Sequence, residues 1–241
     1  PEAVIGFVPS PSAATREDMA GWPSVVRAVA ASHYCARMAD ERLRYAHVVW
    51  NGARPAACVP RDASDCRLVV GCLGRASWEK NFLSAIAAMQ LLPRTVCLRV
   101  AGDGPDRHIY DRASRVWQGE RTVRSDPYLS PDDFFASIDV LLVPSIFEAT
   151  PSVVAEAMVR GVPVVATRVG DLPAILGDGR GVLLPDPSPE SIAEALAGLF
   201  ADRSRLARMS AAGRVFAMEH LTVERMARGW EAAFAEAMGW A

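Results

Sequence analysis

Short apolar runs alternate along the chain with longer segments in which apolar residues recur at the spacing of one helix face. The runs predict strands near residues 25–31, 46–50, 68–73, 95–101, 121–124, 139–143, 162–167 and 181–184. The helical spacing predicts helices over residues 32–44, 78–91, 105–117, 131–138, 151–160, 171–176, 188–200, 202–218 and 222–238. The last three helices follow one another without an intervening strand, so they extend the predicted fold at its C-terminal end.

The predicted strands are apolar at successive positions. Residues 140–143 and 162–166 show no alternation of apolar and polar side chains, which is typical of strands covered on both faces. Together with the strand–helix alternation, this pattern predicts the α/β class, with a doubly wound, Rossmann-like parallel sheet and extra C-terminal helices. Ligands of such sheets bind beyond the carboxyl ends of the strands. The loops after residues 73, 101 and 143 are therefore the candidate site.

The first of these loops combines a turn with two basic side chains. Gly74 lets the chain leave the strand, and Ser77 is a suitable N-cap for the following helix. Arg75 and Lys80, the chain's sole lysine, flank that helix start, where the helix dipole adds about half a positive charge. The loop thus predicts a phosphate site. The alternative is an ordinary turn that carries two solvated cations.

The second loop has the sequence Gly-Asp-Gly-Pro over residues 102–105. Gly102 and Gly104 allow a ligand to approach the backbone closely, and Pro105 suits the first position of a helix. The third glycine of the dinucleotide-binding fingerprint is missing from this sequence, so a tight turn without a ligand is the alternative.

The third loop leads into a helix. Thr150 is predicted as the N-cap of that helix and Pro151 as its first residue. The N–H groups of Ser152 and Val153 would then point back at the strand ends, because the first turn of a helix leaves its N–H groups without intrahelical partners. These groups predict a second anion site that faces the first.

Two carboxylates adjoin this second anion site. Glu148 precedes the helix, and Glu156 lies four residues after Ser152 on roughly the same helix face. Carboxylates beside phosphate-binding helix ends favour sugar or ribose hydroxyls as partners, because each carboxylate can accept two of them. The alternative is a solvated helix glutamate, which the apolar neighbours of Glu156 disfavour.

Charge and cysteine content narrow the function classes. The 241 residues include 26 basic and 28 acidic side chains, a net charge of −2, which gives the molecule as a whole no attraction for nucleic acid or an acidic membrane. The five cysteines form no C-x-x-C pair, so a zinc site and a disulfide framework are disfavoured and a reducing cytoplasm is predicted. No apolar run approaches the roughly 20 residues of a membrane span. The P-loop, G-x-S-x-G, H-E-x-x-H and D-x-D motifs are missing from the sequence as well.

Several motifs succeed one another in a fixed order along the chain. They are Asn51-Gly52, the G-R-x-x-x-x-K-N run of residues 74–81, the G-x-G-P turn of residues 102–105, and the E-x₇-E spacing of Glu148 and Glu156. This combination resembles the nucleotide-sugar domain of GT-B glycosyltransferases of the retaining family 4, or group 1, type. The resemblance spans most of the chain.

The resemblance implies a role for each matching residue. Arg75 and Lys80 would hold the donor diphosphate, and with Glu148, which would face the donor sugar, they are the predicted catalytic residues. Glu156 would bind the ribose hydroxyls. The other predicted donor contacts are Gly74, Gly102, Asp103, Gly104, Tyr128, Leu129, Ala149, Thr150, Pro151, Ser152 and Val153, of which Tyr128 and Leu129 would meet the base. No metal and no cofactor is implied, because the nucleotide sugar is a substrate and the D-x-D motif is missing.

The sequence departs from the family at two places. Residues 149–151 are Ala-Thr-Pro where many members have Gly-Phe-Gly, which bears on sugar selection. Residues 1–50 precede the Asn51-Gly52 turn, where a family member has a whole acceptor-binding domain. The expected organisation is the tail end of an N-terminal acceptor-side Rossmann-like domain over 1–50, a linker over 51–66, a donor-binding domain over 67–220 and a C-terminal helix over 221–241. The chain begins with Pro1 rather than Met, as a fragment or processed form would.

The activity implied by the resemblance is transfer of a sugar from a nucleotide diphosphate sugar to an acceptor with retention of anomeric configuration. The acceptor is a glycan, a lipid-linked molecule or a small molecule, and nucleic acid is not expected as a partner. The expected location is the cytoplasm, and a peripheral contact of the last helix with the inner face of the membrane stays open. The alternative function is a non-catalytic nucleotide-sugar-binding or partner module.

Overall fold

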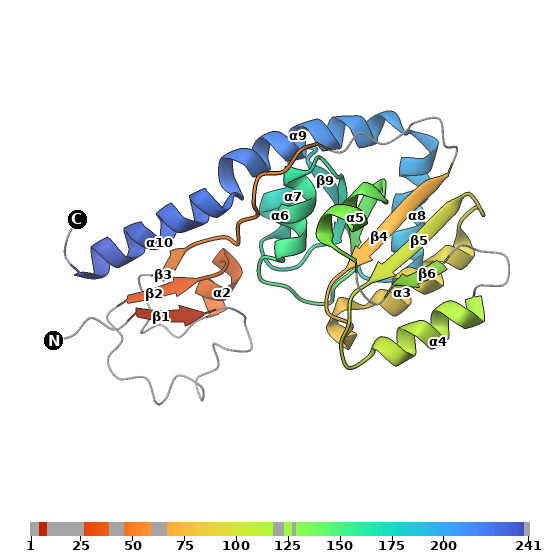
Figure 1. Ribbon diagram of the computed structural model, residues 1–241, viewed down its shortest axis with the longest axis horizontal. Coiled ribbons are helices and arrows are strands. Elements are labelled where there is room, and N and C mark those ends of the chain that lie inside the picture. Colours follow the sequence, from red (N-terminus) through yellow and green to blue (C-terminus); the bar gives the residue numbers. More distant parts are fainter. Residues whose placement is uncertain are drawn as a thin grey trace.

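The computed structural model describes residues 5–8, 27–38, 46–58, 67–117, 123–126 and 129–238. Within these ranges the chain forms a sheet of six strands and a smaller sheet of three strands (Figure 1). Neighbouring strands are parallel in both sheets.

The large sheet consists of β4 (Leu68–Leu73), β5 (Val96–Ala101), β6 (Val123–Asp126), β7 (Val140–Val143), β8 (Val164–Thr167) and β9 (Gly181–Leu184). Its strand order is β6-β5-β4-β7-β8-β9, so the chain adds strands on one side from β4 to β6 and on the other side from β7 to β9. This order places the topological switch point between β4 and β7. β7 and β8 are buried along their whole length, as strands covered on both faces should be. The predicted α/β class and the doubly wound parallel sheet are confirmed.

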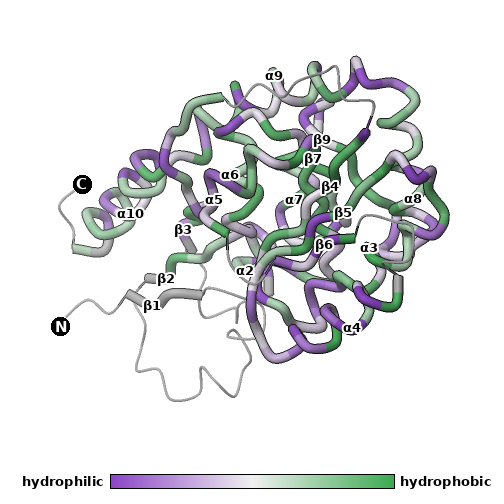
Figure 2. Tube along the Cα trace, turned by 45° about the vertical axis from the view of Figure 1, so that its right-hand side comes forward, coloured by the Kyte–Doolittle hydropathy of each residue, from purple (hydrophilic) through white to green (hydrophobic). Residues whose placement is uncertain are grey.

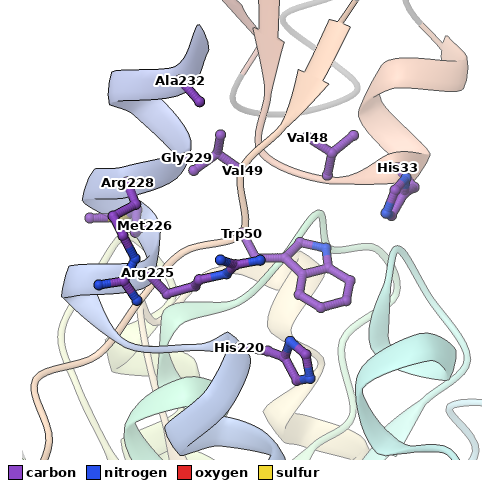
Figure 3. A pocket seen from close by; sticks show the side chains of 10 residues that line it. All are labelled: His33, Val48, Val49, Trp50, His220, Arg225, Met226, Arg228, Gly229 and Ala232. Carbon is purple, nitrogen blue, oxygen red and sulfur yellow. The ribbon is translucent and has the colours of Figure 1, made fainter.

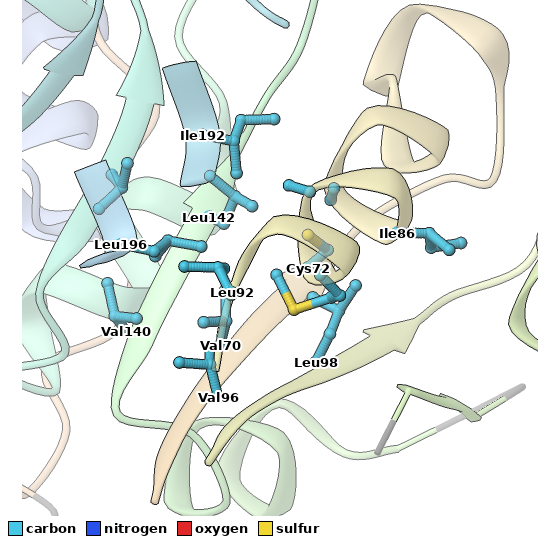
Figure 4. Packing of buried hydrophobic residues seen from close by; sticks show 14 of the residues in the cluster. Val70, Cys72, Ile86, Leu92, Val96, Leu98, Val140, Leu142, Ile192 and Leu196 are labelled. Carbon is cyan, nitrogen blue, oxygen red and sulfur yellow. The ribbon is translucent and has the colours of Figure 1, made fainter. Parts of the chain in front are cut away.

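Helices cover both faces of the large sheet. The helices that follow β4 along the chain are η3 (Trp78–Lys80), α3 (Phe82–Ala88), η4 (Met89–Leu91), α4 (Arg107–Trp117), α5 (Pro131–Ala136), α6 (Ser152–Val159), α7 (Leu172–Leu176), α8 (Pro189–Ala201), α9 (Ser204–His220) and α10 (Val223–Met238). Successive side chains of a strand point to opposite faces, so Leu142 and Leu141 belong to different cores. Figure 4 shows the core of Leu142, which also includes Val70 of β4, Ile86 of α3 and Ile192 of α8.

The smaller sheet packs against the end of the chain. It consists of β1 (Ile5–Val8), β2 (Arg27–Ala30) and β3 (Ala46–Val48), with α2 (His33–Met38) after β2. α9 packs on α6, which belongs to the large unit formed by the six-stranded sheet and its helices. α10 packs on β2 and β3, so α9 and α10 link the two sheets (Figure 1). Val29, Val49 and Ala233 are buried where α10 meets the small sheet. In Figure 2, which is coloured by hydropathy, strands β4 and β7 are mainly hydrophobic, and α4 and α10 carry many hydrophilic residues.

The helix predicted over residues 78–91 is divided into η3, α3 and η4. Asn81 separates η3 from α3, because it has a left-handed backbone with φ of 55°, which asparagine tolerates better than most residues. Its side-chain amide donates to the carbonyl of Pro144 at 3.2 Å and so ties the first loop to the third. Ser77 occupies the N-cap position of η3, as predicted, but its side chain makes no capping hydrogen bond, because its hydroxyl donates to Oε1 of Glu79 at 2.5 Å.

The predicted start of α6 is wrong by one residue. The helix begins at Ser152, and Pro151 occupies the position before it. Thr150 is therefore not the N-cap. Its hydroxyl is buried and donates to the carbonyl of Ala31 at 2.7 Å, a partner from the N-terminal part of the chain.

Three other elements differ from their predicted extent. α4 begins at Arg107, so Pro105 precedes the helix instead of starting it. β1 has no counterpart among the predicted strands. The helix predicted over residues 32–44 is described only as α2, and residues 39–44 lie outside the described residues.

Candidate functional site

A cleft of about 610 Å³ lies at the carboxyl ends of β4 and β7, at the switch point of the large sheet. The loops after these two strands, the start of α6 and Asn51 form its walls. The predicted site residues that line it are Gly74, Arg75, Lys80, Glu148, Ala149, Thr150, Pro151, Ser152 and Val153. The structure therefore brings the first and third loops together at one cleft.

A smaller pocket of about 190 Å³ adjoins this cleft. The two share Leu73, Gly74 and Arg75, and the smaller one is also lined by Gly102, Asp103 and Leu129. The second loop and the segment that precedes α5 thus lie beside the cleft. Together the two pockets offer a continuous surface for an elongated ligand.

Three predicted residues are not placed in these two pockets. Tyr128 lies outside the described residues. Glu156 is half-buried on α6, one turn after Ser152, and Gly104 lies two residues beyond Gly102. Neither Glu156 nor Gly104 lines the cleft or the smaller pocket as the described residues define them.

The glycines of the second loop have a packing role that the sequence did not reveal. A Cβ atom on Gly102 would lie 1.9 Å from the carbonyl oxygen of Gly74, and one on Gly104 would lie 2.5 Å from that of Ala76. Both glycines also have positive φ, 128° and 156°, which residues with a side chain rarely adopt. Glycine is therefore required here for close backbone contact between the first two loops.

Lys80 and Glu148 form an ion pair across the cleft. The Lys80 Nζ atom lies 2.5 Å from Oε1 of Glu148, and the hydroxyl of Ser145 donates to the same oxygen at 2.8 Å. The side chains are mostly buried, with 23% of Lys80 and 11% of Glu148 exposed. Since both line the cleft, an anionic ligand that binds Lys80 would draw it away from Glu148 and leave that carboxylate free to accept hydroxyl groups.

Glu79 anchors the other cation of the cleft. Its Oε1 atom accepts from Arg75 Nη2 at 2.8 Å and from the Ser77 hydroxyl at 2.5 Å. Burial raises the pKa of Glu79, but the hydrogen bonds from Ser77 and Arg75 outweigh it and lower the pKa to about 2. The Arg75 side chain is still 68% exposed, so the guanidinium is oriented yet open to a ligand.

We expect Glu79→Gln to make the fold less sensitive to acid. Because the pKa of Glu79 is about 2 in the folded chain and ordinarily 4.5, its ionised form stabilises the fold above pH 4.5, and this stabilisation is lost as pH falls toward 2. The free energy of unfolding should therefore fall less steeply with acidification in the variant than in the parent, as urea unfolding at a series of pH values would measure. Glu194→Gln, on the exposed side of α8, is the control, and equal slopes for Glu79→Gln and the parent would refute the expectation.

Sequence reasoning missed two aromatic residues of the cleft. Trp78 and Phe147 line it with ring centroids 5.9 Å apart in an edge-to-face arrangement. They are unusually open for aromatic side chains, with 65% of Trp78 and 39% of Phe147 exposed. Their position within polar loops at strand ends was the signal that could have identified them.

Sequence reasoning also missed Asp171, which joins the large unit to the N-terminal part of the chain. This residue is 3% exposed. Its carboxylate accepts the backbone N–H groups of His33 at 2.6 Å and Tyr34 at 2.9 Å, and the indole N–H of Trp50 at 2.8 Å. Asn51, the next residue, donates its side-chain amide to the Thr150 carbonyl at 2.7 Å. Together with the hydrogen bond from the Thr150 hydroxyl to Ala31, these contacts fasten the third loop and Asp171 to residues 31–34 and 50–51.

In the described part of the chain, histidine, cysteine, aspartate and glutamate side chains form no group of three or more that could hold a metal ion. Among the helices described, none is both long enough and apolar enough to cross a bilayer.

The chain is similar in sequence to several glycosyltransferases. The family described as "Glycosyl transferases group 1" matches residues 62–216. The D-inositol 3-phosphate glycosyltransferase of Xylanimonas cellulosilytica is 34% identical over 149 residues, which are 58% of this chain and 36% of that protein. The lipopolysaccharide core biosynthesis mannosyltransferase LpsB of Rhizobium meliloti is 28% identical over 182 residues, which are 70% of this chain and 52% of LpsB. The chain thus spans between a third and about half of the length of these relatives.

Solved structures show the same fold. Anabaena Alr3699/HepE, in complex with UDP and glucose, has a TM-score of 0.82 and 17% identity, with 97% of this chain and 72% of HepE covered. Sucrose-phosphate synthase from Thermosynechococcus elongatus has a TM-score of 0.79 and 18% identity, with 96% of this chain and 66% of the synthase covered. The family match covers well over half of the chain, and every lining residue of the cleft except Asn51 lies within it. The chain therefore belongs to the group 1 glycosyltransferases and has their GT-B type of α/β fold.

Proposed function

We propose that this chain is the donor-binding part of a glycosyltransferase that takes a sugar from a nucleotide diphosphate sugar. The observation that carries the proposal is the cleft at the switch point, where Lys80, Glu148 and the start of α6 meet. A lysine and helix N–H groups suit a diphosphate, and a carboxylate suits sugar hydroxyls. Membership of group 1 and the named activities of the relatives support the same function.

In this proposal the first and third loops share the diphosphate and the sugar. Arg75 and Lys80 bind the phosphates, and the backbone of residues 149–153 completes the contact. These groups would also stabilise the negative charge that develops on the diphosphate when its bond to the sugar breaks. Glu148, released from Lys80 by the phosphate, accepts the sugar hydroxyls.

The nucleoside end of the donor is proposed to occupy the smaller pocket. Gly102, Asp103 and Leu129 line that pocket, and we place the base beside them together with Tyr128. Gly104 contributes by keeping the loop close to Ala76. Glu156, farther along α6, is proposed to bind the ribose hydroxyls.

Glu156→Gln should therefore lower the affinity for ribose-containing ligands and leave the fold intact. Glutamine keeps the shape and one acceptor oxygen but loses the charge that strengthens hydrogen bonds from hydroxyl groups. A loss of about 1.5–3 kcal/mol is expected for the nucleotide, and calorimetric titration would measure it. Glu190→Gln, in the first turn of α8, is the matched control. Unchanged nucleotide affinity in Glu156→Gln would remove the ribose assignment.

Donor binding is expected to need no divalent metal. Lys80, Arg75 and the start of α6 already supply positive charge for the diphosphate. Titration of the preferred donor with and without EDTA measures this, and a lower affinity after chelation would contradict it.

We further propose that transfer retains the anomeric configuration and needs an opposing acceptor-side domain. In this division residues 1–50 are the end of that domain, 51–66 a linker, 67–220 the donor domain and 221–241 a helix that returns to the first domain. Closure of two walls orients donor and acceptor, which can contribute roughly 7–11 kcal/mol to lowering the barrier. Residues 1–241 should thus bind the donor with little transfer, and fusion to a whole acceptor-side domain should restore it, with the product anomer measured by NMR. Rapid transfer by residues 1–241, or inversion, would refute this part.

Thermal unfolding with a panel of nucleotide sugars tests the donor assignment. A true donor at 100 times its dissociation constant should stabilise the chain by about 2.7 kcal/mol. If every nucleotide sugar left the midpoint unchanged, a non-catalytic partner module would be the better description.

A further inference from the structure

A second cavity, of about 350 Å³, lies where the small sheet meets the C-terminal helices. We name it the junction pocket and define it by His33, Trp50, His220, Arg225 and Arg228 (Figure 3). The histidines come from the start of α2 and the end of α9, and the arginines come from α10. Two parts of the chain far apart in the sequence, one between His33 and Trp50 and one between His220 and Ala232, therefore build one concave, cationic and aromatic surface.

Packing fixes the shape of the junction pocket. The Trp50 indole donates to Asp171, and its ring packs 5.9 Å from that of His33 and 6.2 Å from that of Phe216. A Cβ atom on Gly229 would lie 3.1 Å from Cγ2 of Val49, so glycine lets α10 approach the end of β3. The pocket is thus preformed, as small-molecule sites usually are.

The charge of the junction pocket is one-sided. Arg225 and Arg228 lie about one turn apart on α10, both are exposed, and neither has an ion-pair partner within the described part of the chain. No carboxylate is among the described residues that line the pocket. Of the nearby acids, Asp171 accepts three N–H groups, Glu236 pairs with His47, and Glu219 lies 3.6 Å from the ring Nε2 atom of His220.

The junction pocket is separate from the donor cleft. Trp50 lines the pocket, and the next residue, Asn51, lines the cleft. Between them run the hydrogen bonds from Asn51 to the Thr150 carbonyl and from the Thr150 hydroxyl to Ala31. A ligand bound in the junction pocket would therefore be a different molecule from the ligand bound beside Lys80.

We propose that the junction pocket binds the phosphate of a phosphate ester. Arg225 and Arg228 hold the phosphate oxygens, because the guanidinium fork matches phosphate geometry and is always charged. His33, across the pocket from α10, supplies a further ring N–H donor. The carbon part of the ester packs against Trp50. The volume suits a small ester or a single headgroup.

Inorganic phosphate is the first probe, in a Lys80→Ala background that disables the diphosphate site. Arg225→Gln/Arg228→Gln should bind it at least about tenfold more weakly than this background protein, as calorimetry at constant ionic strength would measure. The matched control is Arg112→Gln/Arg115→Gln, an exposed pair with the same spacing on α4 and the same charge change. All four side chains are exposed, and circular dichroism would verify folding. No saturable phosphate binding, or the same loss in the control pair, would overturn the proposal.

A second arm distinguishes the two sources of such a phosphate. α10 continues past the pocket with exposed Phe234 and Met238, which could contact lipid chains beside a headgroup. Flotation with phosphatidylcholine vesicles, with and without phosphatidylglycerol, would detect a headgroup. If the parent binds the anionic vesicles and Arg225→Gln/Arg228→Gln does not, the phosphate belongs to a lipid headgroup. If the protein binds phosphate but no vesicles, the ligand is a free ester. Because nucleotide-sugar binding is measured separately, a failure of either site leaves the other proposal standing.

Discussion

Lys80→Ala will lower the affinity for a nucleoside diphosphate about 10- to 150-fold, because a charge-assisted hydrogen bond contributes about 1.5–3 kcal/mol to binding. The structure adds a second cause in the same direction. Lys80 lies 2.5 Å from Glu148, so its removal also leaves an unneutralised carboxylate in the cleft that is to receive phosphates. Calorimetric titration of the parent and the variant with a nucleotide diphosphate would measure the loss.

Two comparisons separate this effect from a general change of charge. The bare nucleoside should bind Lys80→Ala and the parent almost equally, since it carries no phosphate. Arg112→Ala, which removes an exposed cation from α4, should leave both ligands unaffected. Small and equal losses of nucleoside and nucleotide in Lys80→Ala would show that this lysine is a structural ion-pair partner and not a phosphate ligand.

The fold could be predicted because strands that are buried on both faces have apolar residues at successive positions of the sequence. The strands predicted at residues 139–143 and 181–184 match β7 and β9 to within one residue, and the helical periodicity placed α8, α9 and α10 within two residues of their observed ends. The predicted capping by side chains failed for a different reason. Ser77 occupies the N-cap position but its hydroxyl donates to Glu79, and the Thr150 hydroxyl has a partner 119 residues away, which no local pattern reveals.

The loops of the site could be predicted, and most of their contacts could not. Parallel strands end at one edge, so the loops after β4, β5 and β7 had to lie close together. The pairing of Lys80 with Glu148 joins residues 68 positions apart, and it depends on how the loops fold back over the strand ends. The position of Trp78 in a polar loop is only a weak signal of its exposure, because a tryptophan in a loop is as easily a core residue.

The second large effect concerns stability. Asp171→Ala should lower the free energy of unfolding by about 3 kcal/mol or more, because it leaves three N–H donors without their charged acceptor and each such bond contributes about 1.5–3 kcal/mol. For a chain of this length that corresponds to a fall of roughly 6–12 °C in the thermal midpoint. Calorimetry or circular dichroism would measure it. The thermal midpoint of Asp171→Asn should lie between those of the parent and Asp171→Ala, since the amide keeps one acceptor oxygen but also presents donors to the same N–H groups.

The control for Asp171 is an aspartate whose ion pair is exposed. Asp132 lies 2.6 Å from Arg160, but 82% of its side chain is exposed, so Asp132→Ala should lower the stability by no more than about 1 kcal/mol. Equal midpoints for the Asp171 and Asp132 variants would mean that the bonds to His33, Tyr34 and Trp50 contribute little. A large loss confined to Asp171→Ala would show that this carboxylate fastens the N-terminal part of the chain to the third loop. The position of Asn51 at the donor cleft would then depend on a residue that is itself outside the cleft.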